Sequence, residues 1–411
     1  MSFLGNNKGK YMNTALNKHR TQFRDTLLHN IVPFWLEYGW DQENGGVYSY
    51  LTRQGERCSR VKAVWIQGRF MWLLSKLCNE YGKKDKWLEA AKSCKAFLDK
   101  HCFAPDGRMY FLVTGDGQPV RKRRYWFSEA FYCMASAEYY KATGDADSLE
   151  TARKLFACIL SIYSDPTNDP RKFPPKHEMK MFGLGPPMIM LNVTNVMRTC
   201  DPERSDDYDT AAKKFISDII NRFYNEELKC VFENTDSKGN PMLDTPIGRL
   251  INPGHSAEAS WFLMDEAIYF DDKSLMKKAL NILDWSLELG WDKDNGGIIY
   301  FTDILGYPPE QYEHDMKLWW PQNEATIAAI KAYEATGEER YFNWFETLTK
   351  YQFDNFADDE YGEWVGYLHK NNEKQMPMVK GNYFKGPFHL PRMLILCEQA
   401  LGRLSSPDCH S

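Results

Sequence analysis

The sequence lacks several features that would place it in a common class of protein. Its 411 residues contain no run of about 18 apolar residues, so we expect no membrane-spanning helix. Charges of the two signs nearly cancel, at a net charge of −5, and no basic field exists that would hold a nucleic-acid backbone. No Walker phosphate loop, GxGxxG fingerprint or metal-ligand spacing occurs. We therefore expect neither a membrane protein nor a nucleic-acid-binding protein.

Cysteine is present but is never arranged in close pairs. Ten Cys are scattered along the chain, and none forms a C-x-x-C motif. This spacing is typical of reduced, mostly buried thiols rather than of a disulfide framework or a zinc site. The first residues also carry no apolar segment of the kind found in secretory signals. We therefore expect a cytoplasmic protein without a bound metal.

Aromatic residues, by contrast, are abundant. They make up 15% of the chain, with thirteen Trp, in a total apolar content of 43%. That content suffices for a large core. Sugar-binding clefts and large helical cores both use many aromatic residues, so composition alone does not separate these two explanations.

One motif occurs twice and belongs to a longer repeat. The segments at 38–50 and 289–301 read YGWDQENGGVYSY and LGWDKDNGGIIYF. Similar turns, 59 to 67 residues apart, begin at Asp41, Asp106, Asp165, Asn225, Asp292 and Asp358. The paired glycines permit a tight turn, and the two Trp are expected to pack against a helix end. The motif is therefore interpreted as scaffold, and six units fill the chain.

Each turn lies between two kinds of helical segment. Amphipathic segments, such as 87–102, 209–224 and 273–290, precede the turns. More apolar segments follow them, at 63–77, 127–140, 186–197, 254–270, 319–333 and 388–401. Helices that are apolar nearly all round are buried. Six outer–inner pairs predict an all-α (α/α)6 barrel, a single domain over 1–411 with short β-hairpins at one mouth. An open helical solenoid is the alternative.

Polar residues interrupt the apolar segments close to their beginnings. They are Gln67, Arg69, Ser128, Glu129, Asn192, His255, Glu258, Gln322, Glu324, His389 and Arg392. A buried polar group is costly unless it is paired or functional. Because six segments place such groups at similar positions, we expect a pocket at the mouth where the inner helices begin. Glu258 follows His255 by three residues and shares its helix face.

These residue types suit two reactions. A His near neutral pKa can remove a proton beside a carbonyl, and a fixed Arg can stabilise the resulting enolate. Paired carboxylates would instead suggest glycoside hydrolysis, an option that Glu129, Glu258 and Glu324 leave open.

Five segments, in this order, resemble the N-acylglucosamine 2-epimerase family. They are VWIQGR (64–69), NPGHSAEASW (252–261), KLWWPQNEA (317–325), YGEWVGYL (361–368) and FKGPFHLPR (384–392). The resemblance covers nearly the whole chain. It implies an (α/α)6 barrel that interconverts N-acetylglucosamine and N-acetylmannosamine. It also implies a homodimer and activation by ATP or another nucleotide that is not consumed.

Carried over by position, the resemblance makes His255 and His389 the acid/base pair and Arg69 the group that holds the enolate. It makes Glu258 and Glu324 pocket residues. With the other polar residues of the inner segments, the expected substrate-binding set is Gln67, Glu129, Asn192, Glu258, Gln322, Glu324 and Arg392.

Two positions depart from relatives. Gln322 stands where the family commonly carries a His. Asn192 stands where sugar isomerases and cellobiose epimerases of the wider superfamily carry one, which favours the N-acylhexosamine branch.

Two other functions stay open at this stage. An aldose–ketose isomerase would use the same enolate. A non-catalytic protein that inhibits a protease is the second alternative, because animal members of the family are also named for binding renin. Renin is therefore a further candidate partner.

Overall fold

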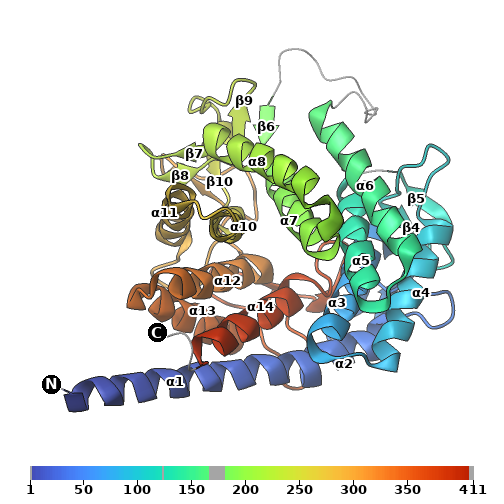
Figure 1. Cartoon of the computed structure of the whole chain (residues 1–411), viewed down its shortest axis with the longest axis horizontal. Coiled ribbons are helices and arrows are strands. Elements are labelled where there is room, and N and C mark those ends of the chain that lie inside the picture. The colour runs from blue at the N-terminus through green and yellow to red at the C-terminus, as the bar shows by residue number, and fades with distance from the viewer. Residues whose placement is uncertain (1, 123–124, 166–180, 407–411) are drawn as a thin grey trace.

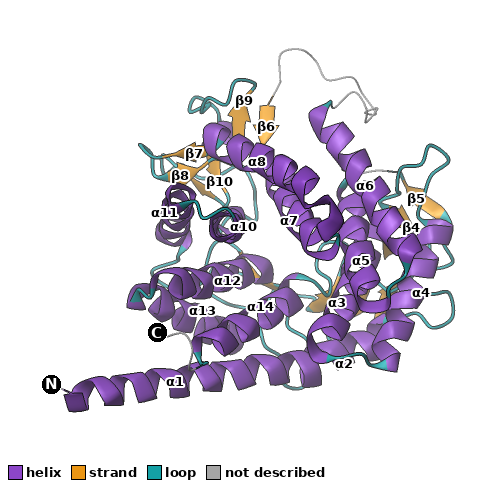
Figure 2. Ribbon diagram, in the orientation of Figure 1, coloured by secondary structure: helices purple, strands orange, loops and turns teal. Residues whose placement is uncertain are grey.

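The computed structural model describes residues 2–122, 125–165 and 181–406, which form two concentric layers of helices (Figure 1, Figure 2). The inner helices are α3 (Val64–Tyr81), α5 (Phe127–Thr143), α7 (Gly185–Cys200), α10 (Pro253–Tyr269), α12 (Trp319–Thr336) and α14 (His389–Leu404). The outer helices are α1 (Ser2–Asp25), α4 (Asp85–His101), α6 (Ala146–Ser164), α8 (Ser205–Arg222), α11 (Lys273–Gly290) and α13 (Glu339–Asn355). After α1 the chain continues through η1 (Thr26–Ile31), α2 (Val32–Phe34) and η2 (Trp35–Gly39).

The apolar pattern explains which helix lies in which layer. In α11 the buried residues include Leu275, Ala279, Ile282 and Leu283, which share one face, whereas Lys277 is exposed. The inner helix α12 is buried continuously from its first residue through 330. Helix termini follow local chemistry, since the Asp272 side chain accepts a hydrogen bond from the Leu275 N–H and so caps α11.

The inner helices follow one another around the ring. Helix α3 packs against α5, α5 against α7, α10 against α12, and α12 against α14, while α1 packs on α14 from outside. The first and last inner helices meet through the rings of Trp72 and Phe388, whose centroids lie 5.0 Å apart. The predicted (α/α)6 barrel is confirmed, and the open solenoid is not observed.

Short antiparallel strands at the mouth join consecutive units. The strand before an inner helix pairs with a strand of the next unit, in the pairs β3 (Lys62–Ala63) with β4 (Leu112–Val113), β6 (Met181–Gly183) with β9 (Asn234–Asp236), β10 (Leu250–Ile251) with β11 (Thr302–Asp303), β12 (Lys317–Leu318) with β13 (Tyr367–Leu368), and β14 (Val379–Gly381) with β1 (Tyr50–Thr52). The last of these pairs closes the ring.

The expected local hairpins account for only part of this arrangement. Hairpins form between β1 and β2 (Arg57–Ser59), β4 and β5 (Pro119–Arg121), and β7 (Tyr224–Asn225) and β8 (Cys230–Val231). Pairing between units arises because neighbouring strands at one mouth satisfy each other's backbone groups. The third predicted turn, which starts at Asp165, runs mainly through 166–180 and lies outside the described residues.

The repeated W-D-x-x-N-G-G motif forms the same turn twice. Asp41 accepts a hydrogen bond from the buried Lys62 ammonium at 2.7 Å, and Asp292 accepts one from Lys317 at 2.8 Å. Gly46 has a φ of +75°, and a Cβ there would come within 2.4 Å of Gln67 Oε1. Only glycine fits this position. The motif is scaffold, as predicted.

Two further expectations concern composition. No helix in the described ranges combines the length and apolar character that a membrane span requires. The nine cysteines among the described residues are all free, and seven of them are buried. Cys409 lies outside the described residues.

Candidate active site

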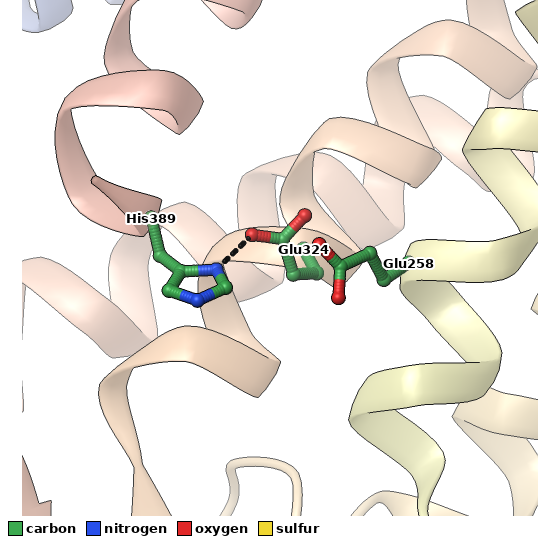
Figure 3. Close-up of side chains that lie close together, drawn as sticks. All are labelled: Glu258, Glu324 and His389. Carbon is green, nitrogen blue, oxygen red and sulfur yellow. Dashed lines mark hydrogen bonds and ion pairs between the residues drawn. The ribbon is translucent and has the colours of Figure 1, made fainter. Parts of the chain in front are cut away.

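The first two turns of four inner helices bring six of the predicted residues together. These are Arg69 on α3, His255 and Glu258 on α10, Glu324 on α12, and His389 and Arg392 on α14. The predicted residues that lie elsewhere are Gln67, Glu129 and Gln322, and the role of Asn192 in substrate binding stays a prediction. Figure 3 shows Glu258, Glu324 and His389, which approach one another from three different helices.

Arg392 is the ionic centre of this cluster. Its Nη2 donates to a carboxylate oxygen of Glu258 and, at 2.7 Å, to Oε1 of Glu324. Glu258, Glu324 and His389 have the composition of a metal site, with potential ligand atoms within 4.8 Å of one another. The Arg392 guanidinium, however, is already bonded to both carboxylates, and its positive charge would repel a metal cation. We therefore assign this cluster an ionic rather than a metal-binding role.

His389 lies at the start of α14 with Nδ1 directed at carboxylate oxygen Oε1 of Glu324, 2.7 Å away. Burial, reinforced by the cations Arg392 and Arg69, holds the pKa of His389 well below its usual value, against an opposing effect of Glu258. The ring is therefore neutral at neutral pH. A hydrogen on Nδ1, donated to Glu324, leaves the lone pair on Nε2. His389 thus has the form of a general base.

The pKa of His255 is shifted in the opposite direction. Its Nδ1 lies 2.9 Å and 3.1 Å from the two carboxylate oxygens of Glu233. Burial alone would lower the pKa of His255, but Glu233, aided by Glu258 and Glu324, raises it above its usual value. Its imidazolium form is thereby favoured. His255 thus has the form of a general acid.

Trp320 contacts both imidazoles. Its ring centroid lies 5.0 Å from that of His255 and 5.8 Å from that of His389. Both histidines therefore contact one indole from helices that belong to different units. Two titratable groups whose surroundings push their pKa values apart are the pattern of an acid and a base that act on one substrate.

Arg69 supplies a cation whose hydrogen-bonding capacity is only partly used. Its Nη1 donates to the carbonyl of Phe384 at 3.0 Å, and its guanidinium carbon lies 4.1 Å from the centre of the Phe131 ring. Its Nε is buried and has no hydrogen-bond partner among the described residues. Burial and the nearby Arg392 lower the pKa of Arg69 to about 9, so the group stays charged at neutral pH. Arg69 can therefore receive a developing anion.

Gln67 and Gln322 take a structural position instead of joining the cluster. Gln67 exchanges two hydrogen bonds with the backbone of Val47, at 2.6 Å and 2.8 Å. Gln322 does the same with Ile298, at 2.8 Å and 2.7 Å. Both amides are fully buried and tie an inner helix to its turn. We therefore leave both out of the proposed substrate-binding set.

Glu129 also lies apart from the cluster. Glu129 is fully buried and accepts hydrogen bonds from Arg108 Nε at 2.7 Å and from the Met109 N–H at 2.9 Å. This repeats the helix-to-turn contact of the two glutamines. Asn192 is half-buried on α7, and its side chain has no hydrogen bond to another described residue.

The structure adds three residues that sequence reasoning missed. Glu233 contacts His255, Trp320 contacts both histidines, and Trp261 donates to Glu324 Oε2 at 3.0 Å. The two Trp could have been found, because both lie in apolar segments beside chosen residues. Glu233 carries no such signal, because it follows a two-residue strand in a segment that reads only as a turn.

The chain was compared with protein families and with solved structures. The model of the N-acylglucosamine 2-epimerase (GlcNAc 2-epimerase) family matches residues 36–384. N-acylglucosamine 2-epimerase of Rattus norvegicus is 35% identical over 390 residues, which cover 92% of this chain and 90% of that protein. Cellobiose 2-epimerase of Dictyoglomus turgidum is 26% identical over 397 residues, covering 92% and 97%.

A solved structure gives the same fold. Cellobiose 2-epimerase from Bacillus thermoamylovorans superposes with a TM-score of 0.81 at 21% sequence identity, covering 94% of this chain and 100% of that one. At this identity the likeness concerns the fold alone.

Proposed function

We propose that this chain, which belongs to the N-acylglucosamine 2-epimerase family, interconverts N-acetylglucosamine and N-acetylmannosamine by inverting C2. The observation that carries the proposal is the pair of histidines that contact the same Trp320 indole from different units and have opposite pKa shifts. Both named relatives are 2-epimerases, although of different sugars. The reaction class therefore rests on more than one relative, and the choice of sugar rests on the more similar one.

The reaction begins on the open-chain aldehyde, in which the C2 proton lies beside a carbonyl. Neutral His389 takes this proton through Nε2, and the C–H electron pair moves to form an enolate whose charge is on the aldehyde oxygen. Arg69 stabilises that oxygen. His255 then delivers its proton to the other face of C2, and the electron pair returns from oxygen to carbon. The reverse direction exchanges the two roles.

The cluster fits glycoside hydrolysis less well. A retaining hydrolase needs carboxyl groups about 5 Å apart, one as an acid and one as a free nucleophile. Glu258 and Glu324 both bond to Arg392, which ties up the oxygens that such a reaction would need. Glu129, the third candidate, is bound to Arg108.

Product analysis by NMR separates the epimerase from the isomerase. Incubation with N-acetylmannosamine is expected to give N-acetylglucosamine, whereas a parallel incubation with mannose tests for a ketose. An aldose–ketose isomerase needs a hydroxyl on C2, which the N-acylated sugar lacks. Formation of a ketose from mannose, with no conversion of N-acetylmannosamine, would contradict the proposal.

Nucleotide activation, homodimer formation, cytoplasmic location and renin binding are further proposals that rest on the family resemblance. The parts of the chain that the structure describes contain no glycine-rich phosphate loop, and no step above uses a nucleotide. The same incubation with and without ATP tests activation. Light scattering tests whether the protein is a homodimer. Cell fractionation tests its cytoplasmic location, and co-purification with renin tests whether it binds that protease.

A further inference from the structure

Glu233 is fixed at the mouth by its own backbone. It follows β8, and its N–H donates to the carbonyl of Leu250 at 3.2 Å. Its carbonyl accepts a hydrogen bond from the N–H of Leu184 at 3.0 Å. The side chain thus leaves a backbone that is held on both sides, and it reaches Nδ1 of His255 with both oxygens.

The carboxylate of Glu233 acts on His255 without competition. Among the described residues, His255 is its only cationic partner. Glu324, which occupies the corresponding place beside His389, also bonds to Arg392 and Trp261. A carboxylate that is shared with an arginine contributes little net charge to an imidazole. The two histidines therefore have carboxylate partners of unequal effect.

We propose that Glu233 is a positioning residue for His255. It fixes the ring with Nδ1–H directed at the Glu233 carboxylate, and it holds the imidazolium form, so that Nε2 carries the proton delivered to C2. This inference rests on the proposed function. It assigns the resting enzyme one protonation state, with His255 charged and His389 neutral. That state accepts the epimer whose C2 proton faces His389.

The other charged groups around His255 do not replace Glu233. Glu258 lies on the same helix, Glu324 on α12 and His389 on α14. Both glutamates share Arg392 and raise the pKa of His255 less than Glu233 does, and His389 is itself neutral. Burial opposes the charge on His255, and Glu233 is the largest influence that favours it. Removing the Glu233 charge should therefore leave burial as the main influence on His255, and the pKa of His255 should fall.

The test is the variant Glu233→Gln, which keeps the shape of the side chain and removes its charge. NMR titration of the His255 ring should show a pKa lower by about one to two units than in wild type. The alkaline limb of kcat/KM against pH should move to lower pH by a similar amount, and the acid limb should stay in place. Glu233→Asp keeps the charge and should recover part of the shift.

Asp236→Asn is the matched control. Asp236 ends β9, three residues after Glu233, and its carboxylate bonds to Asn240 and to the Lys238 N–H. This variant should leave the pKa of His255 and both limbs of the profile unchanged.

An unchanged His255 pKa in Glu233→Gln would overturn the proposal, whatever the loss of kcat, because it would show a structural role only. If Glu233→Gln does not fold, Glu233→Asp carries the test, since its withdrawn carboxylate must still lower that pKa. The titration needs no substrate. A lowered pKa in a protein without epimerase activity would therefore refute the proposed function alone, and normal epimerisation with an unshifted pKa would refute the role of Glu233 alone.

Discussion

At the scale of single residues, the two arginines of the site differ in their ion-pair partners. Arg392 is paired with two carboxylates, whereas Arg69 has no carboxylate partner among the described residues and donates to the backbone carbonyl of Phe384. An enolate oxygen is stabilised best by a cation whose charge is not already paired with a carboxylate. Arg69 is therefore the residue that we expect to bind it.

We predict that Arg69→Ala lowers kcat by about 100-fold to 1,000-fold, the usual loss when one donor to a developing oxyanion is removed. Arg69→Lys should recover only part of this, because Lys lacks the planar fork of donors. Circular dichroism should show that both variants remain folded. The control is Arg198→Lys in the last turn of α7, which is bonded to Glu266 and should retain its kcat. A wild-type kcat in Arg69→Ala would remove this residue from the mechanism.

We predict a bell-shaped dependence of kcat/KM on pH. The base His389 must be neutral, and its pKa is lowered, so activity should fall only as the pH drops well below 6.5. The acid His255 must be protonated, and its pKa is raised, so activity should fall as the pH rises above 6.5. A profile that already declines as the pH is lowered through 6.5 would contradict the assignment of the base.

At the scale of elements, the first two turns of the inner helices serve two purposes. In α3, α10, α12 and α14 they carry the reactive cluster, while Gln67, Glu129 and Gln322 bind the backbone of the preceding turn. From sequence alone, both kinds of residue are polar interruptions of an apolar helix. For this reason, the substrate-binding set expected from the sequence includes three residues that instead bind the backbone of a turn.

We predict that Gln67→Ala and Gln322→Ala each lower the free energy of unfolding by about 1–3 kcal/mol, because each leaves buried backbone groups without partners. Their kcat should remain within about threefold of wild type, which is below 1 kcal/mol in the barrier. Gln322→His should keep kcat within roughly tenfold. Urea denaturation and steady-state kinetics check these values. A large loss of kcat in Gln322→Ala with unchanged stability would return this residue to the substrate pocket.

The predictability of the elements follows from their length. The helices were predicted because apolar periodicity accumulates over four or five turns, as in α11. The strands that link units are two or three residues long, so their pairing leaves no pattern in the sequence. Glu233 was missed for the same reason, since only the pairing of β6 with β9 and the contact with Leu250 place it beside His255.

At the scale of the whole molecule, closure of the barrel creates the site. His255 belongs to the fourth unit and His389 to the sixth, and the ring brings both against Trp320 of the fifth. The strand pair β14–β1 joins the last unit to the first, which also places Arg69 of α3 beside the loop that carries Phe384. An open solenoid would leave Arg69 remote from both histidines.

The most direct test of this account is NMR of N-acetylglucosamine and N-acetylmannosamine, each incubated with the protein in heavy water. A site with two histidines should place solvent deuterium at C2 of the product in both directions. His255→Asn and His389→Asn should each abolish inversion, and one of them should still exchange the C2 proton of a single epimer, because removal survives while delivery to the other face fails. Epimerisation that leaves the original proton at C2, or wild-type rates in either variant, would contradict the account.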